Sequence, residues 1–495
     1  MGAGPVGKAI AMFIDSNKKH DFIVALDKAI DLFTDQLIKK DPKFFFYRNA
    51  NLQFALEKYL YFTYSHNPIL MQSFLGQTDL ESDDKILVRL AKFMGGTIKY
   101  CPKRFAWLKR KIKDSRLIIL DLFSKINVKR NEINKGKLLF FVEQEKFKNY
   151  FEPITSKISI FNWAYLIRDN LKLVKLLESQ KFSYLQYAPF FRYRLLGKSS
   201  KGMTEFRFLL RDFDALYDLL LREKPIKIVL AEGNSTQHEL INQVSKVLGI
   251  PVVCIQQGWS PIVHTGFRHM SYDKMLVWGQ GFADLLQTHN PEQKFIVTGS
   301  HVISPRAGKS ATSKVLTFFI PNNREYIKYD RIITSADLES FYELILWTAQ
   351  EFPDFLINIR EHPGAPLSKV EKLMLKGENI KFSPSTAVSL DSVLSQTTIG
   401  ITFHSTTILE CVACGIPTLI INPATSYKFE PDTTAYGLSK EVVNLEQAKE
   451  ILLDIIHNNS ISSLSKEIKR RFNETFFPYN KEKSIQNILR HIKIK

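Results

Sequence analysis

The chain has 495 residues, 45% of them hydrophobic and 12% aromatic, which is enough to fill the cores of two or three globular domains. Its 68 Lys and Arg exceed its 50 Asp and Glu, and the formal charge of +18 indicates an anionic partner, such as a phosphorylated substrate, an acidic polysaccharide, a nucleic acid or an anionic membrane. Four cysteines and the lack of any run of about 18 apolar residues exclude a disulfide framework and a spanning helix, so we expect a cytoplasmic protein.

The first part of the chain has the periodicity of helices. From about residue 17 to 135, apolar side chains recur at helical spacing, as in Phe22, Leu26, Ala29 and Phe33. We therefore predict a helical N-terminal region over residues 1–135.

The end of this region is strongly basic. Residues 99–137 contain 13 Lys or Arg against 3 acidic residues, with aromatic and aliphatic side chains interleaved. Such a segment could make peripheral contact with an anionic membrane, or it could be a solvated basic helix face, and the pattern leaves both open. We predict no nucleic-acid partner, because neither zinc-finger spacing nor an RNA-binding aromatic signature is present.

After residue 136 the pattern changes to short apolar runs that alternate with helical segments, which is typical of βα units in a parallel sheet. The predicted strands of a first series are KLLFFV, KIVLAEG, PVVCIQ, KMLVWG and KFIVTG. A linker-like segment at 300–313 precedes a second series, KVLTFFI, FLINIR, IKF, TIGITF and PTLII. We predict an α/β chain with two Rossmann-like, doubly wound domains, 136–305 and 306–495, whose carboxyl strand ends face a cleft.

The segment TIGITFHSTTILECVACGIPTLIIN places a hydroxyl-rich turn between a buried strand and a helix. Ser405, Thr406 and Thr407 lie where the N–H groups of a helix N-terminus can hold a phosphate, and Glu410 follows one turn later. This run resembles the donor site of GT-B glycosyltransferases, where a helix bearing Glu is followed by Gly-x-Pro and a strand. The resemblance implies that Glu410 hydrogen-bonds the ribose of a nucleotide-sugar donor.

A second predicted strand, in INIREHPGAP, ends with Arg360, Glu361, His362 and Pro363. With the hydroxyl cluster downstream, this His-Pro pair resembles motifs of bacterial sialyltransferases, polysialyltransferases and capsular Kdo transferases, which use CMP-activated acidic sugars. The resemblance implies that His362 contacts the donor phosphate with help from Arg360. Positive charge there would stabilise the departing phosphate without a metal. By itself, a His before a Pro is often only a structural turn residue.

In IVLAEGNSTQHE, Glu232 and Gly233 follow a buried strand of the first domain directly. They resemble the acidic–Gly motif of the same families, in which the carboxylate is the general base that activates an acceptor hydroxyl. Glu232 could instead cap the next helix, and only one acid is present where two are common. The segment PVVCIQQGW is also similar to those families, but Gln257 stands where a His is usual, so Gln257 or His264 would take its place in the cleft.

Asn323 and Arg324, after the first strand of the second domain, could contact the donor or form an ordinary polar turn. Because no cluster of Cys, His and acidic residues has metal-ligand spacing, we predict no metal and no cofactor beyond the nucleotide sugar.

Taken together, the resemblances imply a metal-independent glycosyltransferase, cytoplasmic or peripheral on the inner membrane face. Its preferred donor would be a CMP-activated acidic sugar such as Kdo or sialic acid, and its acceptor a surface polysaccharide or glycolipid. Three alternatives stay open: a CDP-polyol phosphotransferase of teichoic-acid type, an isomerase like UDP-N-acetylglucosamine 2-epimerase, and a non-catalytic nucleotide-sugar-binding or membrane scaffold protein.

Overall fold

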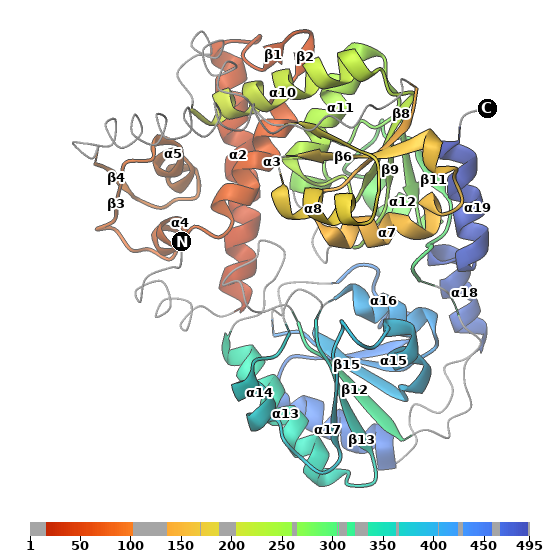
Figure 1. The fold of residues 1–495 in the computed structure, drawn as a ribbon. Helices are drawn as coiled ribbons and strands as arrows, with labels where there is room; N and C mark the ends of the chain where they lie inside the picture. Colours follow the sequence, from red (N-terminus) through yellow and green to blue (C-terminus); the bar gives the residue numbers. More distant parts are fainter. Residues whose placement is uncertain are drawn as a thin grey trace.

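Two parallel sheets, each with helices on both faces, lie one above the other, with N-terminal helices along one side and C-terminal helices along the other (Figure 1). The computed structural model describes residues 16–101, 136–168, 170–187, 204–259, 265–303, 305, 314–321, 335–362, 366–403, 405–423, 429–457 and 466–493.

The first sheet has seven strands in the order β11-β10-β9-β8-β5-β6-β7, and all its pairings are parallel. The strands are β5 (Leu138–Phe141), β6 (Trp163–Arg168), β7 (Tyr184–Tyr187), β8 (Lys227–Ala231), β9 (Val252–Ile255), β10 (Lys274–Val277) and β11 (Phe295–Val297). The helices that accompany them are α7 (Glu145–Thr155), α8 (Leu171–Ser179), α10 (Thr204–Glu223), α11 (Thr236–Leu248) and α12 (Gln280–Gln287). The strands β6 and β7 are additional to those that the sequence analysis predicts.

The second sheet has six parallel strands in the order β14-β13-β12-β15-β16-β17. Its strands are β12 (Val315–Phe319), β13 (Leu356–Arg360), β14 (Ile380–Ser383), β15 (Ile399–Phe403), β16 (Thr418–Ile421) and β17 (Ser439–Val442). Its helices are α13 (Ser335–Glu351), α14 (Lys369–Met374), α15 (Leu390–Gln396), α16 (Thr406–Ala413) and α17 (Leu445–His457).

Each sheet has a point at which the direction of winding reverses. The chain moves outward from β5 to β7 and then returns to the other side of β5 with β8; in the second sheet, β12 and β15 flank the same reversal. In open parallel sheets the loops at the carboxyl ends of these two central strands diverge, and this crevice is where such folds bind ligands.

The N-terminal helices pack into the same hydrophobic core as one face of the first sheet. They are α2 (Ser16–Lys40), α3 (Gln53–Tyr64), α4 (Pro68–Phe74) and α5 (Lys85–Phe93), and two short sheets pair β1 (Phe46–Tyr47) with β2 (Ala50–Asn51) and β3 (Glu81–Ser82) with β4 (Lys99–Tyr100). The helical N-terminal region that the periodicity predicts is therefore present over its described part.

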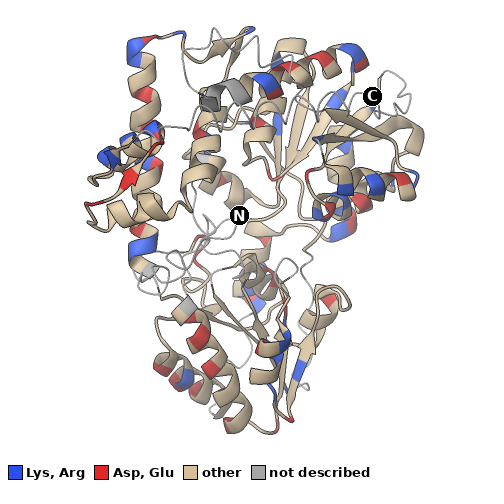
Figure 2. Ribbon diagram, turned by 60° about the vertical axis from the view of Figure 1, so that its left-hand side comes forward, with Lys and Arg blue, Asp and Glu red and all other residues tan. Residues whose placement is uncertain are grey.

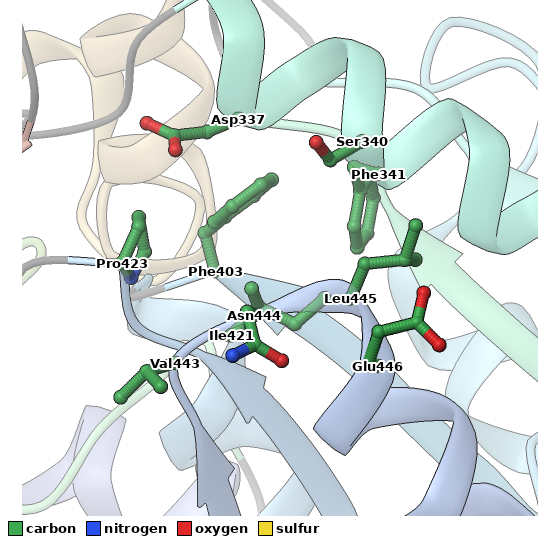
Figure 3. Close-up of a pocket in the computed structure, with 10 residues that line it drawn as sticks. All are labelled: Asp337, Ser340, Phe341, Phe403, Ile421, Pro423, Val443, Asn444, Leu445 and Glu446. Atoms are coloured by element: carbon green, nitrogen blue, oxygen red, sulfur yellow. The ribbon is translucent and has the colours of Figure 1, made fainter.

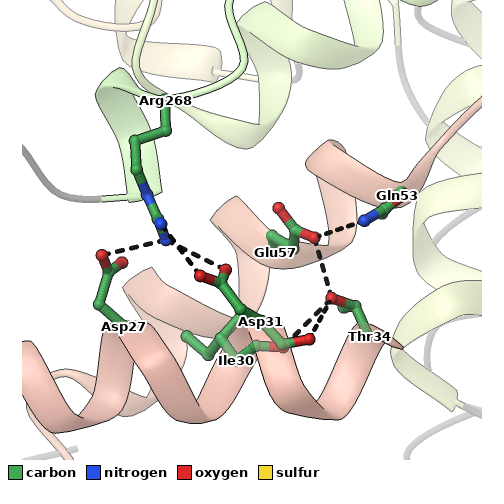
Figure 4. A network of polar contacts seen from close by, with 7 residues as sticks. All are labelled: Asp27, Ile30, Asp31, Thr34, Gln53, Glu57 and Arg268. Atoms are coloured by element: carbon green, nitrogen blue, oxygen red, sulfur yellow. Dashed lines mark hydrogen bonds and ion pairs between the residues drawn. The ribbon is translucent and has the colours of Figure 1, made fainter. Parts of the chain in front are cut away.

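Polar contacts tie these helices to the first domain (Figure 4). Arg268 forms ion pairs of 3.0 Å with Asp27 and with Asp31 on α2. On α3, the buried ammonium group of Lys58 donates a hydrogen bond to the Gly266 carbonyl at 2.7 Å. Because each of these cations has its partner, the interface can bury charge without leaving it uncompensated.

Glu57 lies in the same interface, where its Oε1 accepts hydrogen bonds from Thr34 and Gln53, both at 2.9 Å. Burial raises the pKa of Glu57 from 4.5 to about 7. The folded protein therefore holds a proton that the unfolded chain has released, so Glu57 lowers stability as the pH rises from about 4.5 to about 7. We expect Glu57→Gln to match the wild type near pH 5 and to be more stable by about 3 kcal/mol at pH 8.5, as measured by urea unfolding. An equal pH dependence in Glu57→Gln and in the exposed control Glu292→Gln would contradict this.

Two C-terminal helices connect the domains. Helix α18 (Lys466–Phe476) packs against α12 of the first domain and α16 of the second, and α19 (Lys481–Ile492) packs on α7. Asn473 of α18 donates to the Ala413 carbonyl at the end of α16 (3.3 Å), and Lys481 at the start of α19 pairs with Asp391 at 2.7 Å. The last helices thus belong to both domains and brace one against the other.

Basic and acidic residues are interspersed on the helices visible in Figure 2. Residues 99–137 have 13 basic and 3 acidic residues, a net +10 of the total +18. Most of this segment, 102–135, lies outside the described residues. The predicted membrane contact therefore stays a prediction, and more than half of the net charge belongs to it.

Candidate functional site

The carboxyl edges of the two sheets meet. The loop after β9 touches the start of α16, where the Thr406 hydroxyl donates to the Trp259 carbonyl at 3.0 Å and the Trp259 N–H approaches the same hydroxyl at 3.4 Å. The Trp259 indole N–H donates to the Glu430 carbonyl. Two doubly wound domains with facing carboxyl edges form the GT-B arrangement, as the sequence analysis predicts.

Glu232 follows β8 at the reversal point of the first sheet and is held in an uncommon backbone conformation. The Gly233 N–H donates to the Ala231 carbonyl at 2.9 Å, so Glu232 is the central residue of a γ-turn, with φ of 72°. This left-handed conformation costs a residue with a side chain roughly 1–2 kcal/mol. Helix α11 is capped by Ser235, whose hydroxyl accepts the His238 N–H at 3.3 Å. Capping, the structural alternative for Glu232, is therefore done by another residue.

Gly233 has its own reason to be glycine. Its φ is +77°, and a Cβ built there would lie 2.6 Å from the Cys254 sulfur and 3.1 Å from the Tyr272 ring. The Tyr272 hydroxyl donates to the Gly233 carbonyl at 2.6 Å. These contacts fix the turn that presents Glu232.

A second carboxyl group lies beside Glu232. The register pairs Phe140 of β5 with Val229 of β8, so Glu143 and Glu232, three positions further along each strand, leave the sheet side by side. Burial and the Glu232 carboxylate raise the pKa of Glu143 to about 7, against the opposing charges of Arg168 and Lys146. The sequence analysis missed Glu143, although its position directly after KLLFFV, at the end of a predicted strand, is the signal that could have found it.

A hydrogen-bonded network continues from this pair along the carboxyl edge of the sheet. Arg168, the last residue of β6, pairs with Asp212 of α10 at 2.7 Å. The same Asp212 oxygen accepts from Gln237 at 3.2 Å, and Gln237 in turn accepts from the Tyr187 hydroxyl of β7 at 2.9 Å. The network links four elements around the crevice and holds their polar groups in place.

On the second domain, the hydroxyl-rich turn precedes α16 as expected. Ser405 is the N-cap, and its hydroxyl accepts the Thr407 N–H at 3.3 Å. Thr406 contacts the first domain through Trp259, as described above, and His404 lies outside the described residues. Of the three predicted donor-binding hydroxyls, one therefore caps the helix and one joins the domains.

Glu410 lies on α16, one turn after this start, and is partly buried. Burial and the Asp391 carboxylate raise the pKa of Glu410 to about 7, while Lys481 and Arg360 oppose the shift. A carboxyl group that is half protonated near neutral pH can both accept and donate hydrogen bonds, which suits two neighbouring hydroxyls such as those of a ribose.

Arg360, at the end of β13, is buried and turned to the same side. Its Nη1 donates to three backbone carbonyls, those of Ser383 (3.3 Å), Pro384 (3.3 Å) and Val388 (2.7 Å). This anchors the loop before α15 and holds the guanidinium near Glu410, whose charge acts on its pKa. A role on the donor phosphate stays a prediction.

The next residues diverge in their surroundings. Glu361 is buried and pairs with Lys372 of α14 at 2.6 Å, which makes it part of the scaffold. His362 is partly buried at the carboxyl edge, where the sequence analysis expects it, and Pro363 lies outside the described residues.

Four other predicted site residues have these positions. Gln257 is partly buried in the loop that carries Trp259, on the first-domain wall of the cleft. His264, Asn323 and Arg324 lie outside the described residues.

A cavity of about 240 Å³ opens at the carboxyl ends of β15 and β16 (Figure 3). The rings of Phe341 and Phe403, 4.8 Å apart, form one wall, while Asp337, Asn444 and Glu446 line it with polar groups. It lies on the side of the sheet covered by α13 and α17, whereas α16 with Glu410 covers the other side. The second domain thus has two separate concave regions at this edge.

Within the described ranges, no group of three or more His, Cys, Asp or Glu side chains is arranged to hold a metal ion. Of the helices described, none has the length and apolarity to cross a bilayer.

No protein-family model matches the sequence, and no curated protein matches it. Solved structures resemble the chain at low identity. A putative UDP-N-acetylglucosamine 2-epimerase from Listeria monocytogenes is 13% identical with a TM-score of 0.49, over 72% of this chain and 96% of that one. The UDP-GlcNAc 2-epimerase from Neisseria meningitidis, solved with UDP-GlcNAc bound, is 16% identical with a TM-score of 0.48, over 72% and 98%. MurG from Acinetobacter baumannii is 10% identical with a TM-score of 0.45, over 72% and 100%. Similarity at this level does not identify a substrate.

Proposed function

We propose that this protein is a glycosyltransferase that binds a nucleotide-activated sugar on its second domain and an acceptor hydroxyl on its first. The observation that carries the proposal is the pair of reversal points that face one cleft. One bears Glu232 in a strained turn, and the other leads into the capped start of α16 with Glu410 behind it. Backbone strain at such a point is typical of functional sites.

The two walls divide the reaction. The N–H groups at the start of α16 and the side chain of His362 favour the negative charge that grows on the nucleotide phosphate as the bond to the sugar breaks. Glu232 on the opposite wall accepts the proton of the attacking hydroxyl as the new bond forms. No step requires a metal, in line with the sequence-based prediction.

Within this class we propose a CMP-activated acidic sugar as donor and a surface polysaccharide or glycolipid as acceptor. This finer assignment rests on the His-Pro pair and the Ser/Thr turn, which resemble those of sialyl- and Kdo transferases. Contact of residues 99–137 with an anionic membrane would bring the enzyme to such acceptors.

The test is nucleotide binding by isothermal titration calorimetry with CMP, CDP, UDP and GDP. We expect one cytidine nucleotide to bind best and Glu410→Ala to weaken its binding at least tenfold, because about 1.4 kcal/mol is lost with each tenfold change and a hydrogen bond to a charged group contributes about 1.5–3 kcal/mol. Glu450→Ala, exposed on α17, is the matched control and should bind as the wild type does.

Other results would change the assignment. Absence of binding to all four nucleotides, or equal binding by Glu410→Ala, would overturn the donor site. Preference for UDP, with interconversion of UDP-GlcNAc in the absence of any acceptor, would establish a sugar epimerase instead. Release of nucleotide from CMP-sialic acid, CMP-Kdo, UDP-GlcNAc and GDP-mannose then identifies the donor.

A further inference from the structure

Two acidic side chains leave the centre of the first sheet together. Glu143 ends the segment that follows β5, Glu232 ends the one that follows β8, and the parallel register sets them side by side at the reversal point. Neighbouring strands of a sheet lie about 4.8 Å apart, so the two carboxyl groups are within direct electrostatic reach. Only Glu232 belongs to the motif that the sequence resembles.

We infer that Glu143 is a positioning residue for the base: its carboxyl group and that of Glu232 bind one proton between them, and the acceptor proton is taken up by this pair. The inference rests on the proposed function. In the transfer step, the acceptor oxygen forms a bond to the anomeric carbon, the bond from that carbon to the phosphate oxygen breaks, and the phosphate leaves with the electron pair. The acceptor proton moves to Glu232 and is then shared with Glu143.

The charges around Glu143 support this. Glu232 on β8 and burial act to raise its pKa, to about 7, while Arg168 on β6 and Lys146 on α7 act to lower it. Of the other polar groups near by, Tyr187 on β7 bonds to Gln237, and Asp212 on α10 is neutralised by Arg168. The first carboxylate to lose its proton therefore makes the second retain one up to neutral pH.

A shared proton has a catalytic consequence. A single carboxylate with the ordinary pKa of about 4.3 is a weak base for a sugar hydroxyl. When both members of the pair are ionised, the proton that arrives is held with an affinity near neutrality, which matches the base to the pH at which it works. Like charges held close together also create the demand for that proton.

The test is the pH profile of sugar transfer or nucleotide release, with the donor found among the four nucleotide sugars. We expect wild-type kcat to rise with pH and level off above about 7. In Glu143→Gln the profile should be flat from about pH 5.5 to 8, with a plateau lower by about tenfold, because the base reverts to an ordinary carboxylate. Glu143→Asp should keep the inflection, which a merely structural role would not require, and the exposed Glu145→Gln should behave as wild type.

A second measurement needs no donor. The wild-type midpoint of thermal unfolding should fall, relative to that of Glu143→Gln, by a few degrees between about pH 5 and 8.5, because only the wild type loses a bound proton there. Glu232→Gln should reduce this fall, since it removes the charge that holds the proton.

The outcomes separate the two ideas. An inflection retained in Glu143→Gln, or a difference in midpoint that does not change with pH, overturns the inference while leaving the glycosyltransferase assignment. A pH-dependent difference without turnover of any of the four nucleotide sugars overturns the proposed function and the catalytic role, and leaves the proton pair as a property of the fold.

Discussion

Replacing Glu232 with Gln is expected to lower kcat for sugar transfer by about 10²–10⁴-fold, the usual contribution of a general base, while the affinity for nucleotide stays within about twofold. The amide has nearly the same shape as the carboxylate but cannot accept a proton, so only the transition state loses an interaction. Nucleotide binds on the other domain, near Glu410, so its affinity should not depend on this change. Calorimetry and initial rates on the same preparation measure both quantities.

The comparison variant for this experiment is Glu152→Gln, on the outer surface of α7, where the carboxyl is exposed. It should retain wild-type kcat. A loss of less than about threefold in Glu232→Gln would show that another group accepts the proton, whereas loss of nucleotide binding would show that the substitution has disturbed the cleft as a whole.

Gly233→Ala should destabilise the protein by about 2–5 kcal/mol, the largest effect on stability that we expect from one methyl group. The left-handed φ of +77° costs Ala about 1–2 kcal/mol, and overpacking of a filled core costs about 1–3 kcal/mol more. The new Cβ would be 2.6 Å from the buried Cys254 sulfur, so β9 or the γ-turn has to move. Urea unfolding of the full chain, monitored by tryptophan fluorescence, measures the loss.

Gly249→Ala is the matched control, because Gly249 has a similar φ of +69° but no atom within 4 Å of its Cβ position. It ends α11 and should cost only the backbone contribution of about 1–2 kcal/mol. Equal losses in the two variants would show that the contact with Cys254 is relieved without cost and that the turn is not held as tightly as the structure indicates.

Local patterns were enough to predict much of the fold. The apolar strands β8 and β15 are each followed by a polar turn with a serine cap, Ser235 and Ser405, and both helices begin where these serines predict. The strands β6 and β7 escaped prediction because WAYLIR and YLQY carry no turn signal as strong as those of the other strands.

The sequence by itself determined the two βα series, the turn that presents Glu232 and the position of Glu410 at the start of a helix, because neighbouring residues settle strand, turn and cap. Only the tertiary structure decided which distant residues share the cleft. It brought Glu143 to Glu232 through strand order, spent Thr406 on the contact with Trp259, and turned Arg360 onto backbone carbonyls. These outcomes depend on contacts between segments far apart in the chain, and such contacts leave no periodic signal in the sequence.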